Sequence, residues 1–486
     1  MKKLFIALGL TMVPVLMSAK VVPGSLITDN MVLRQNGKAK LYGTATPGSE
    51  VKATPSWDNV TRSVKAGTDG KWQLFVETPA GGYTPYTITL SDSPSKKGKA
   101  NADDVVLKNV LIGEVWLASG QSNMEMPLKG FAGCCTEGGY DEIATSRQKA
   151  DKIRFFVVPL KQSDTPLDEV SSTWTVPSPD TSPDYSALAW NFAKRLNDVL
   201  DVPVGIVNCA YGGAKVESWT PREIVETYSD VSLDPADIEK MVHYHRPVLM
   251  YNAMFNPVKN YTYDGIIWYQ GCSNVGRHED YPARLANMVG HWRKEIGEGE
   301  IPFYSVEIAP YDYGSEDGKS WAPLLREAQW KATDIIPNSG IICTNDLVKP
   351  YERFNIHPSD KTTPGKRLAE LALNKTYGKT RFPVVSPHYK SHKFEDGAAW
   401  VAIDSPSDGI CRNYDIEGFE VAGADKVFHP ADSVWFKWQT NEFVVSSKEV
   451  PEPVAVRYGW RDFLPGNVHG GNYLPLIPFR TDDWQP

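Results

Sequence analysis

One serine stands where the sequence pattern changes from a strand to a helix. Residues 113–128 read GEVWLASGQSNMEMPL, in which an apolar run predicts a buried strand that ends at Ser119-Gly120. Ser122 follows, at the start of a predicted helix. A serine at such a turn lies near backbone amides that can stabilise developing negative charge, so Ser122 is a candidate nucleophile. The alternative is that Ser122 only caps the helix, which is the common role of a serine at this place.

Three later clusters each follow a predicted strand. Gly213 belongs to a double glycine after the strand predicted over 204–208, where it can offer a backbone amide to a ligand. Gln270 and Asn274 follow the next strand and supply neutral amide donors suited to an oxyanion. His357 lies beyond the last strand, and its imidazole could take the serine proton and return it to a leaving alcohol. Taken singly, each cluster has an ordinary explanation: a tight turn, polar strand ends or a surface histidine.

The elements that must position these residues lie between 104 and 378. Strands alternate there with amphipathic helices, which predicts an α/β domain with a doubly wound, mostly parallel sheet of about five strands. The strands are predicted over 115–118, 204–208, 265–269, 303–308 and 340–344, and the clearest helices over 186–200 and 364–373. Ligands bind such sheets at the carboxyl ends of the strands, where each cluster falls or lies just beyond.

The flanking regions have a different pattern. Residues 20–103 and 379–486 contain short alternating runs separated by turn signals, which predicts an N-terminal β-sandwich domain and a C-terminal β-rich domain. The C-terminal strands are either a third domain or the missing half of the first sandwich. Residues 1–19 combine a basic start, an apolar core and a small-residue cleavage site, which predicts a secretory signal peptide cleaved after Ala19. We therefore expect an exported protein, periplasmic or extracellular, with no membrane span.

Composition narrows the class of partner. A formal net charge of -8 argues against nucleic acid as a ligand. Fifteen tryptophans and 22 tyrosines suit stacking on sugar rings, although buried aromatics in β-domains are commoner. The six cysteines are scattered, and His243 and His245 are spaced so that they diverge on a helix, so we predict no metal site and no cofactor.

In this order the four clusters resemble the signature blocks of the SGNH hydrolase superfamily, which are built around Ser, Gly, Asn and His. More closely, the chain resembles the sialate O-acetylesterase family along nearly its whole length. Besides residues 113–128, the resemblance rests on Asp29-Asn-Met-Val-Leu33, Gly212-Gly213, Glu217-Ser-Trp-Thr220, Tyr251-Asn-Ala-Met254, Ile267-Trp-Tyr-Gln-Gly271, Ile356-His-Pro358, Gly365-Lys-Arg-Leu-Ala369, Val456-Arg-Tyr-Gly-Trp460 and Pro478-Phe-Arg-Thr-Asp482.

The resemblance implies a serine esterase that removes O-acetyl groups from sugars without a metal. Ser122 would be the nucleophile and His357 the general base and acid. The oxyanion hole would comprise the backbone amides of Ser122 and Gly213 and the side chain of Asn274, with Gln270 as a neighbouring candidate. The expected substrate is an acetylated carbohydrate, above all 9-O-acetylated sialic acid. An acetylxylan or other plant-polysaccharide acetylesterase is the alternative enzyme, and a non-catalytic glycan-binding protein is the alternative class.

The sequence departs from the family pattern at two positions. Cys272 stands where relatives often have glutamate, and a buried thiol is the expected replacement. An aspartate usually precedes the histidine by two or three residues, but here Asn355 and Phe354 occupy those positions. An asparagine could only orient the imidazole, so either Asp346 supplies the carboxylate from elsewhere or the enzyme works as a Ser-His dyad. We favour the dyad, or a backbone carbonyl as the partner of His357.

Two loop arginines are further candidates. Arg277 and Arg353 lie near the predicted crevice and could clamp a sugar carboxylate through two parallel hydrogen bonds. Loop arginines are more commonly solvated, so both interpretations stay open.

Overall fold

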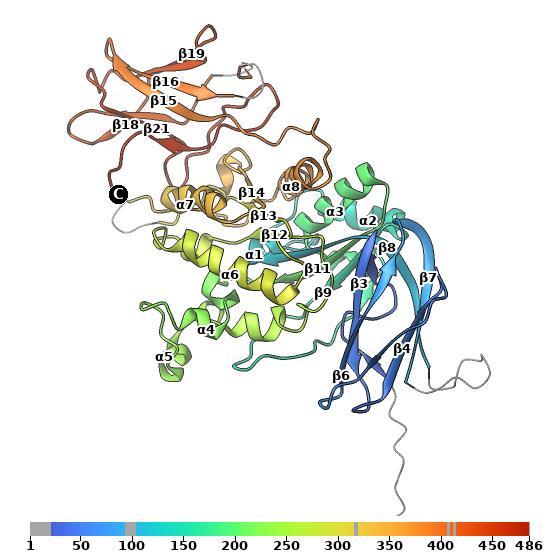
Figure 1. Ribbon diagram of the computed structural model, residues 1–486. Helices are drawn as coiled ribbons and strands as arrows, with labels where there is room; N and C mark the ends of the chain where they lie inside the picture. Colours follow the sequence, from blue (N-terminus) through green and yellow to red (C-terminus); the bar gives the residue numbers. More distant parts are fainter. Residues whose placement is uncertain (1–20, 93–103, 315–318, 406–408, 412–414, 486) are drawn as a thin grey trace, which may run out of the picture.

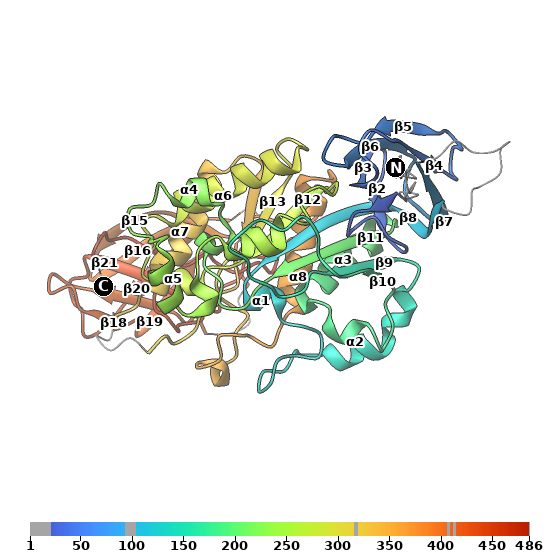
Figure 2. The same cartoon turned by 90° about the horizontal axis from the view of Figure 1, so that it is seen from below.

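The chain folds as three regions in a row, described by a computed structural model over residues 21–92, 104–314, 319–405, 409–411 and 415–485. Figures 1 and 2 show a β region at the N-terminal end, an α/β region in the middle and a second β region at the C-terminal end. The expected signal peptide over 1–19 lies outside the described residues.

A parallel sheet forms the centre of the molecule. Its strand order is β9 (Ile153–Val157), β11 (Val204–Ala210), β8 (Val105–Gly120), β12 (Gly265–Tyr269), β13 (Phe303–Val306) and β14 (Ser339–Ile342), with the short β10 (Trp174–Thr175) antiparallel beside β9. The prediction of about five parallel strands missed β9. Arg154 sits inside this strand and is buried, and its guanidinium donates hydrogen bonds to the backbone carbonyls of Ala150 and Ile153. A charged residue within five positions hides the apolar run from a pattern search.

Strand β8 joins the central sheet to the N-terminal region. Its first half pairs with β7 (Gly82–Ser91) and β2 (Val32–Arg34), whereas its second half lies between β11 and β12. The predicted boundary at residue 104 therefore separates β8 from sandwich strands with which it pairs. The sandwich is completed by β4 (Glu50–Pro55) and β5 (Arg62–Lys65) in the same sheet and by a second sheet of β1 (Val22–Pro23), β3 (Gly37–Thr44) and β6 (Lys71–Thr78).

Helices cover both faces of the parallel sheet. On one face α3 (Ala187–Leu200) packs against α8 (Thr362–Lys375), and on the other α6 (Tyr281–Ile296) packs against α7 (Ala322–Ile335). Along β8, Trp116 and Ala118 join the core beneath α3 and α8, while Val115 and Leu117 join the opposite core. This alternation confirms the predicted doubly wound arrangement. The shorter helices are α1 (Ser122–Glu125), α2 (Gly139–Thr145), α4 (Arg222–Val225) and α5 (Pro235–Lys240).

The C-terminal strands form a sandwich of their own. One sheet has the order β15 (His388–Glu395), β16 (Ala398–Asp404), β20 (Glu442–Ser446), β19 (Ser433–Lys437), and the other β18 (Phe428–Pro430), β17 (Phe419–Ala422), β21 (Ala455–Tyr458), β22 (Phe479–Arg480). A separate apolar core, including Val401, Phe443 and Val421, lies between them. Of the two alternatives, the third β unit is therefore the one that the structure shows.

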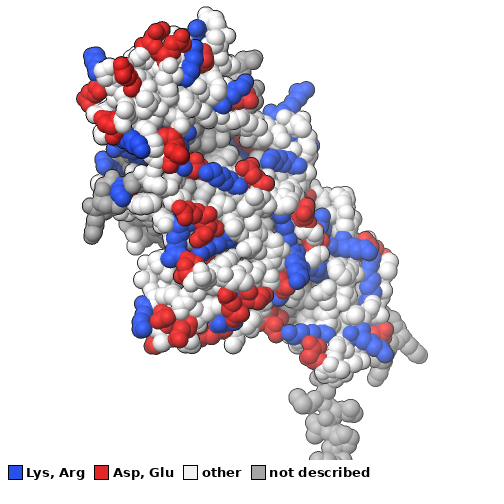
Figure 3. Space-filling view, turned by 60° about the vertical axis from the view of Figure 1, so that its left-hand side comes forward, with Lys and Arg blue, Asp and Glu red and all other residues white. Residues whose placement is uncertain are grey.

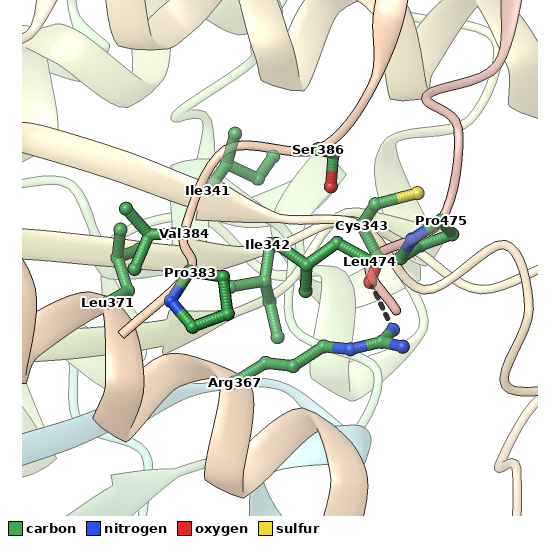
Figure 4. A pocket seen from close by; sticks show the side chains of 10 residues that line it. All are labelled: Ile341, Ile342, Cys343, Arg367, Leu371, Pro383, Val384, Ser386, Leu474 and Pro475. Carbon is green, nitrogen blue, oxygen red and sulfur yellow. Dashed lines mark hydrogen bonds between the residues drawn. The ribbon is translucent and has the colours of Figure 1, made fainter. Parts of the chain in front are cut away.

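The α/β region meets this sandwich closely. Figure 4 shows a cavity there, between α8, β14 and residues 474–475, in which Arg367 donates a hydrogen bond to the Cys343 carbonyl. Its volume of about 10 Å³ admits no more than a water molecule, so we exclude it as a substrate site. On the face in Figure 3, acidic and basic side chains are interspersed. In the described part of the chain, no helix combines the length and the apolar character needed to cross a bilayer.

Candidate active site

Ser122 lies at the carboxyl end of β8, where the strand turns sharply into α1. Gly120 has a φ of +139°, and a Cβ there would lie 2.2 Å from the Tyr269 carbonyl oxygen, so only glycine fits. Gln121 precedes α1 in an extended conformation, its backbone amide bonded to that same carbonyl at 2.9 Å. The capping position therefore belongs to Gln121, and Ser122 is a half-buried residue inside the helix. The cap explanation of Ser122 does not match this geometry.

The double glycine after β11 lies directly beside the serine. A Cβ on Gly212 would come within 3.6 Å of Ser122 Cβ, and the Gly212 amide donates a hydrogen bond to the Glu125 carboxylate in α1. Gly213 has a φ of +74°, and a Cβ there would lie 2.4 Å from the Tyr244 ring. Because Glu125 engages Gly212, the neighbouring Gly213 amide is the donor left for a ligand at Ser122.

Asn274 is held by a buried hydrogen-bond network. Its Oδ1 accepts from Gln270 Nε2 at 2.7 Å and from the Val216 amide at 3.2 Å, and its Nδ2 donates to Glu217 Oε2 at 3.1 Å. These contacts fix the amide orientation and leave one Nδ2 hydrogen for a ligand. The arrangement brings Asn274, from the loop after β12, to the loop after β11 that carries Gly213.

Gln270 has a different position from the one expected of an oxyanion donor. Its Nε2 donates to the Ala214 carbonyl at 3.1 Å as well as to Asn274, and its Oε1 accepts from Tyr281 Oη at 3.0 Å. Both amide hydrogens are therefore used within the protein. This geometry does not support Gln270 as an oxyanion donor and places it to orient Asn274.

Glu217 is a site residue whose role the sequence motif does not reveal. It is buried, and its Oε1 accepts from the buried Arg284 while its Oε2 accepts from Asn274. The sequence signal for such a contact was an acidic residue among apolar and small residues. The partner Arg284 lies 67 positions away, so the sequence alone could not identify it.

His357 is joined to the serine turn through Asn123. Asn123 Nδ2 donates to the Ile356 carbonyl at 2.9 Å, and Lys361 Nζ donates to Asn123 Oδ1 at 2.9 Å and to the Pro358 carbonyl at 2.6 Å. Asn123, the residue after the candidate nucleophile, therefore holds the backbone before the candidate base, and Lys361, which is bonded to Asn123, holds the backbone after it. Sequence reasoning missed this pair, although Asn123 stood in the GQSNM segment.

The imidazole itself is poorly solvated. Its Nε2 is buried without a hydrogen-bond partner among the described residues, and the ring of Phe131 meets it edge-on at 5.3 Å between centroids. Burial, reinforced by the charge of Lys361, lowers the pKa of His357 to about 4. The ring is therefore neutral at physiological pH, as a general base requires.

Comparisons with known proteins show the family of the chain. A family model described as carbohydrate esterase, sialic acid-specific acetylesterase matches residues 112–374, more than half of the chain. Sialate O-acetylesterase of Mus musculus is 26% identical over 528 residues, which cover 94% of this chain and 93% of the mouse protein. The Homo sapiens protein of that name is 26% identical over 393 residues, covering 75% and 72%. The crystal structure of a carbohydrate acetylesterase from Xanthomonas citri is 30% identical, with a TM-score of 0.81 and coverage of 96% and 100%.

The chain belongs to this carbohydrate esterase family. It is accordingly a carboxylic ester hydrolase of the carbohydrate esterase type.

Asp346 and Asn355 were the two side chains considered as partners of the His357 imidazole in the esterase. Neither one contacts the ring. Both Asp346 oxygens pair with Arg367, at 2.7 and 2.8 Å, and His469 Nε2 lies 3.0 Å from one of them. Burial opposes ionisation of Asp346, but these contacts outweigh it and lower its pKa to about 2. Asn355 donates to the His357 carbonyl at 2.8 Å and accepts from its amide at 3.0 Å, so it positions the backbone and not the ring.

Cys272 is a buried free thiol in the esterase, as expected. Burial raises its pKa to about 11, although a hydrogen bond with Tyr313 partly offsets this. The thiol therefore stays protonated and is a poor nucleophile.

The remaining candidates lie at different places. Arg277 is paired with Asp230 and lines a hollow near Asn274, whereas Arg353 pairs with Asp312 at 2.8 Å and has a largely exposed side chain. His243 and His245 lie in one short 3-10 turn. Across the described residues, no group of three or more His, Cys, Asp or Glu side chains is placed to hold a metal ion.

Proposed function

We propose that the protein is an exported serine esterase that hydrolyses O-acetyl esters on sugars, with 9-O-acetylated sialic acid as its substrate. The observation that carries the proposal is the link from Asn123, the neighbour of Ser122, to the His357 backbone, together with the packing of Gly212 against Ser122. Residues from the ends of β8 and β11 and from the loop after β14 thereby meet at one place. The curated relatives are sialate O-acetylesterases, and the leader-like residues 1–19 support export.

In the first step Ser122 Oγ attacks the acetyl carbonyl carbon while His357 takes the hydroxyl proton. The carbonyl oxygen becomes an oxyanion, which accepts hydrogen bonds from the Ser122 and Gly213 amides and from Asn274 Nδ2. Gln270 and Glu217 keep Asn274 in the orientation that presents this donor.

The ester C–O bond then breaks, and the sugar oxygen leaves with the proton that His357 had taken. Water, deprotonated by His357, attacks the acetyl-enzyme and releases acetate and free Ser122. The proposed mechanism uses a Ser-His dyad, because neither Asp346 nor Asn355 contacts the ring through its side chain.

A hollow that Glu125 of the Ser122 helix lines has room for the sugar. It measures about 400 Å³ and is lined by Glu125, Phe131 and Asn208, among others. Glu125 belongs to the helix of Ser122, and Phe131 contacts the His357 ring, so two lining residues neighbour the proposed nucleophile and base. The size falls within the usual range of ligand pockets.

Acetate release from 9-O-acetylated sialic acid, with acetylxylan in parallel, tests the proposal. Ser122→Ala should lower kcat by about 10³-fold or more, and an organophosphonate should label wild-type protein at Ser122 only. Thermal unfolding of the variant serves as the folding control. Release from acetylxylan alone would favour the plant-polysaccharide alternative, and a protein without turnover or labelling would be the glycan-binding alternative.

A further inference from the structure

A second hollow is lined by neighbours of the proposed oxyanion donors. It measures about 200 Å³ and its lining includes Lys215, Glu217, Asp230, His245 and Arg277. Lys215 follows Gly213 by two residues, and Glu217 is bonded to Asn274. His245 follows Tyr244, whose ring covers Gly213. We call this hollow the Lys215 pocket.

The acidic groups of the Lys215 pocket are already paired. Glu217 uses one oxygen for Arg284 and the other for Asn274. Asp230 uses one oxygen for Arg284 and the other for Arg277. Asp280 also contacts Arg284, but its side chain is 65% exposed and it does not line the pocket. Lys215 is therefore the charged residue of the pocket that takes no part in these ion pairs.

The Lys215 ammonium has no partner in the part of the chain that the structure describes. Across the described residues no group lies at hydrogen-bond or ion-pair distance from its Nζ, although the residue is half-buried. Burial lowers the pKa of Lys215, Arg277 and Arg284 add to this effect, and the charge of Glu217 opposes it. A partly desolvated cation without a counter-ion is unfavourable, and an anion bound beside it relieves that cost.

The size of the Lys215 pocket limits what it can receive. Pockets that enclose a whole small ligand measure about 300–1,000 Å³, so about 200 Å³ admits one substituent and the adjoining part of a sugar. A carboxylate matches both the size and the unpaired positive charge.

We propose that the Lys215 pocket is the subsite for the carboxylate of an acidic sugar whose acetyl ester lies at Ser122. The proposal rests on the esterase function above and adds the residue that selects for charge. Lys215 donates to the carboxylate, while Arg277, held by Asp230, adds positive potential at the rim. A neutral acetylated sugar leaves Lys215 without a counter-ion and is bound less well.

Calorimetry on the Ser122→Ala protein tests the subsite without any turnover. The two ligands are N-acetylneuraminic acid and its methyl ester, which differ only in the carboxylate charge. The acid should bind more tightly, and Lys215→Met in this background should weaken acid binding by about 10- to 100-fold while leaving the methyl ester unchanged. Lys215→Arg should retain most of the affinity. Lys393→Met should have no effect, because Lys393 is an exposed lysine paired with Glu395 in the C-terminal sandwich. Equal affinity for the two ligands, or binding of neither, overturns the subsite.

Kinetics separate the subsite from the esterase function. With Ser122 present, Lys215→Met should lower kcat/KM for 9-O-acetyl-N-acetylneuraminic acid by about 10- to 100-fold and leave p-nitrophenyl acetate within about twofold. If kcat/KM of Lys215→Met fell for both substrates while its thermal unfolding stayed unchanged, Lys215 would belong to the machinery that serves every substrate. That result would overturn the proposal that Lys215 selects for charged sugars. Absence of turnover of either substrate by wild-type protein would instead refute the esterase function, and the calorimetry would still decide the subsite.

Discussion

His357 should stay neutral, and the esterase active, well below the pH at which an ordinary histidine takes up a proton. Burial and then the charge of Lys361 lower its pKa to about 4 from an ordinary value of 6.5. At pH 5 a pKa of about 4 leaves about 90% of the imidazole neutral, whereas a pKa of 6.5 would leave about 3%. Asp346, which could have raised this value, is occupied by Arg367 and His469.

The measurement is the pH dependence of kcat/KM for p-nitrophenyl acetate between pH 3.5 and 8, which reports groups of the free enzyme. The acidic midpoint should lie near pH 4. Lys361→Met should raise it, but not as far as 6.5, because burial is the larger cause of the shift. A wild-type midpoint near 6.5 would refute the reasoning.

Acid unfolding needs a separate control in this experiment. A histidine whose pKa is lower in the folded than in the unfolded protein binds its proton in the unfolded state first, so the stability it contributes falls as the pH drops from about 6.5 to about 4. Far-UV circular dichroism at each pH and full recovery of activity at pH 7 distinguish protonation of the base from loss of the fold.

Two substitutions test other parts of the site. Asp346→Asn should destabilise the fold by on the order of 3 kcal/mol, because it breaks a buried ion pair, yet leave the acidic midpoint unchanged; a shifted midpoint would mean that Asp346 acts on His357. Gly213→Ala should lower kcat/KM by about 10²-fold, because φ is +74° and the new Cβ would overlap the Tyr244 ring. Gly48→Ala, with φ +78° in the N-terminal sandwich and open space around the Cβ, is the matched control, and similar losses in the two variants would contradict this reasoning.

The sequence indicated where the candidate clusters lie along the sheet because strand ends are local signals. The strands that end before Ser122 and Gly213 were recognisable as apolar runs, and parallel strands bring their carboxyl ends to one edge of the sheet. The missed strand β9 carries Arg154, whose burial depends on backbone carbonyls that its own sequence does not reveal. The continuity of β8 with the N-terminal sandwich was also hidden, because its 16 residues serve two sheets with different partners.

Contacts between distant residues were beyond prediction. Lys361 meets Asn123 across 238 positions, and Arg284 meets Glu217 across 67. Each residue alone is an ordinary polar side chain on a helix or turn. Only the folded arrangement shows that these contacts are buried, and burial gives them their influence on the site.

The Asn123 contacts explain how a base without a carboxylate partner can still be positioned. A carboxylate beside the imidazole would fix the ring, but it can only accept hydrogen bonds. The Asn123 amide donates to the Ile356 carbonyl and accepts from Lys361 at the same time, so this side chain links the serine turn to the backbone that carries His357. Because Asn123 follows Ser122 directly, any movement of the serine turn moves this anchor with it. In the proposed mechanism the nucleophile and the base therefore keep their relative position through the backbone, and the role of an orienting carboxylate passes to the neighbour of the nucleophile.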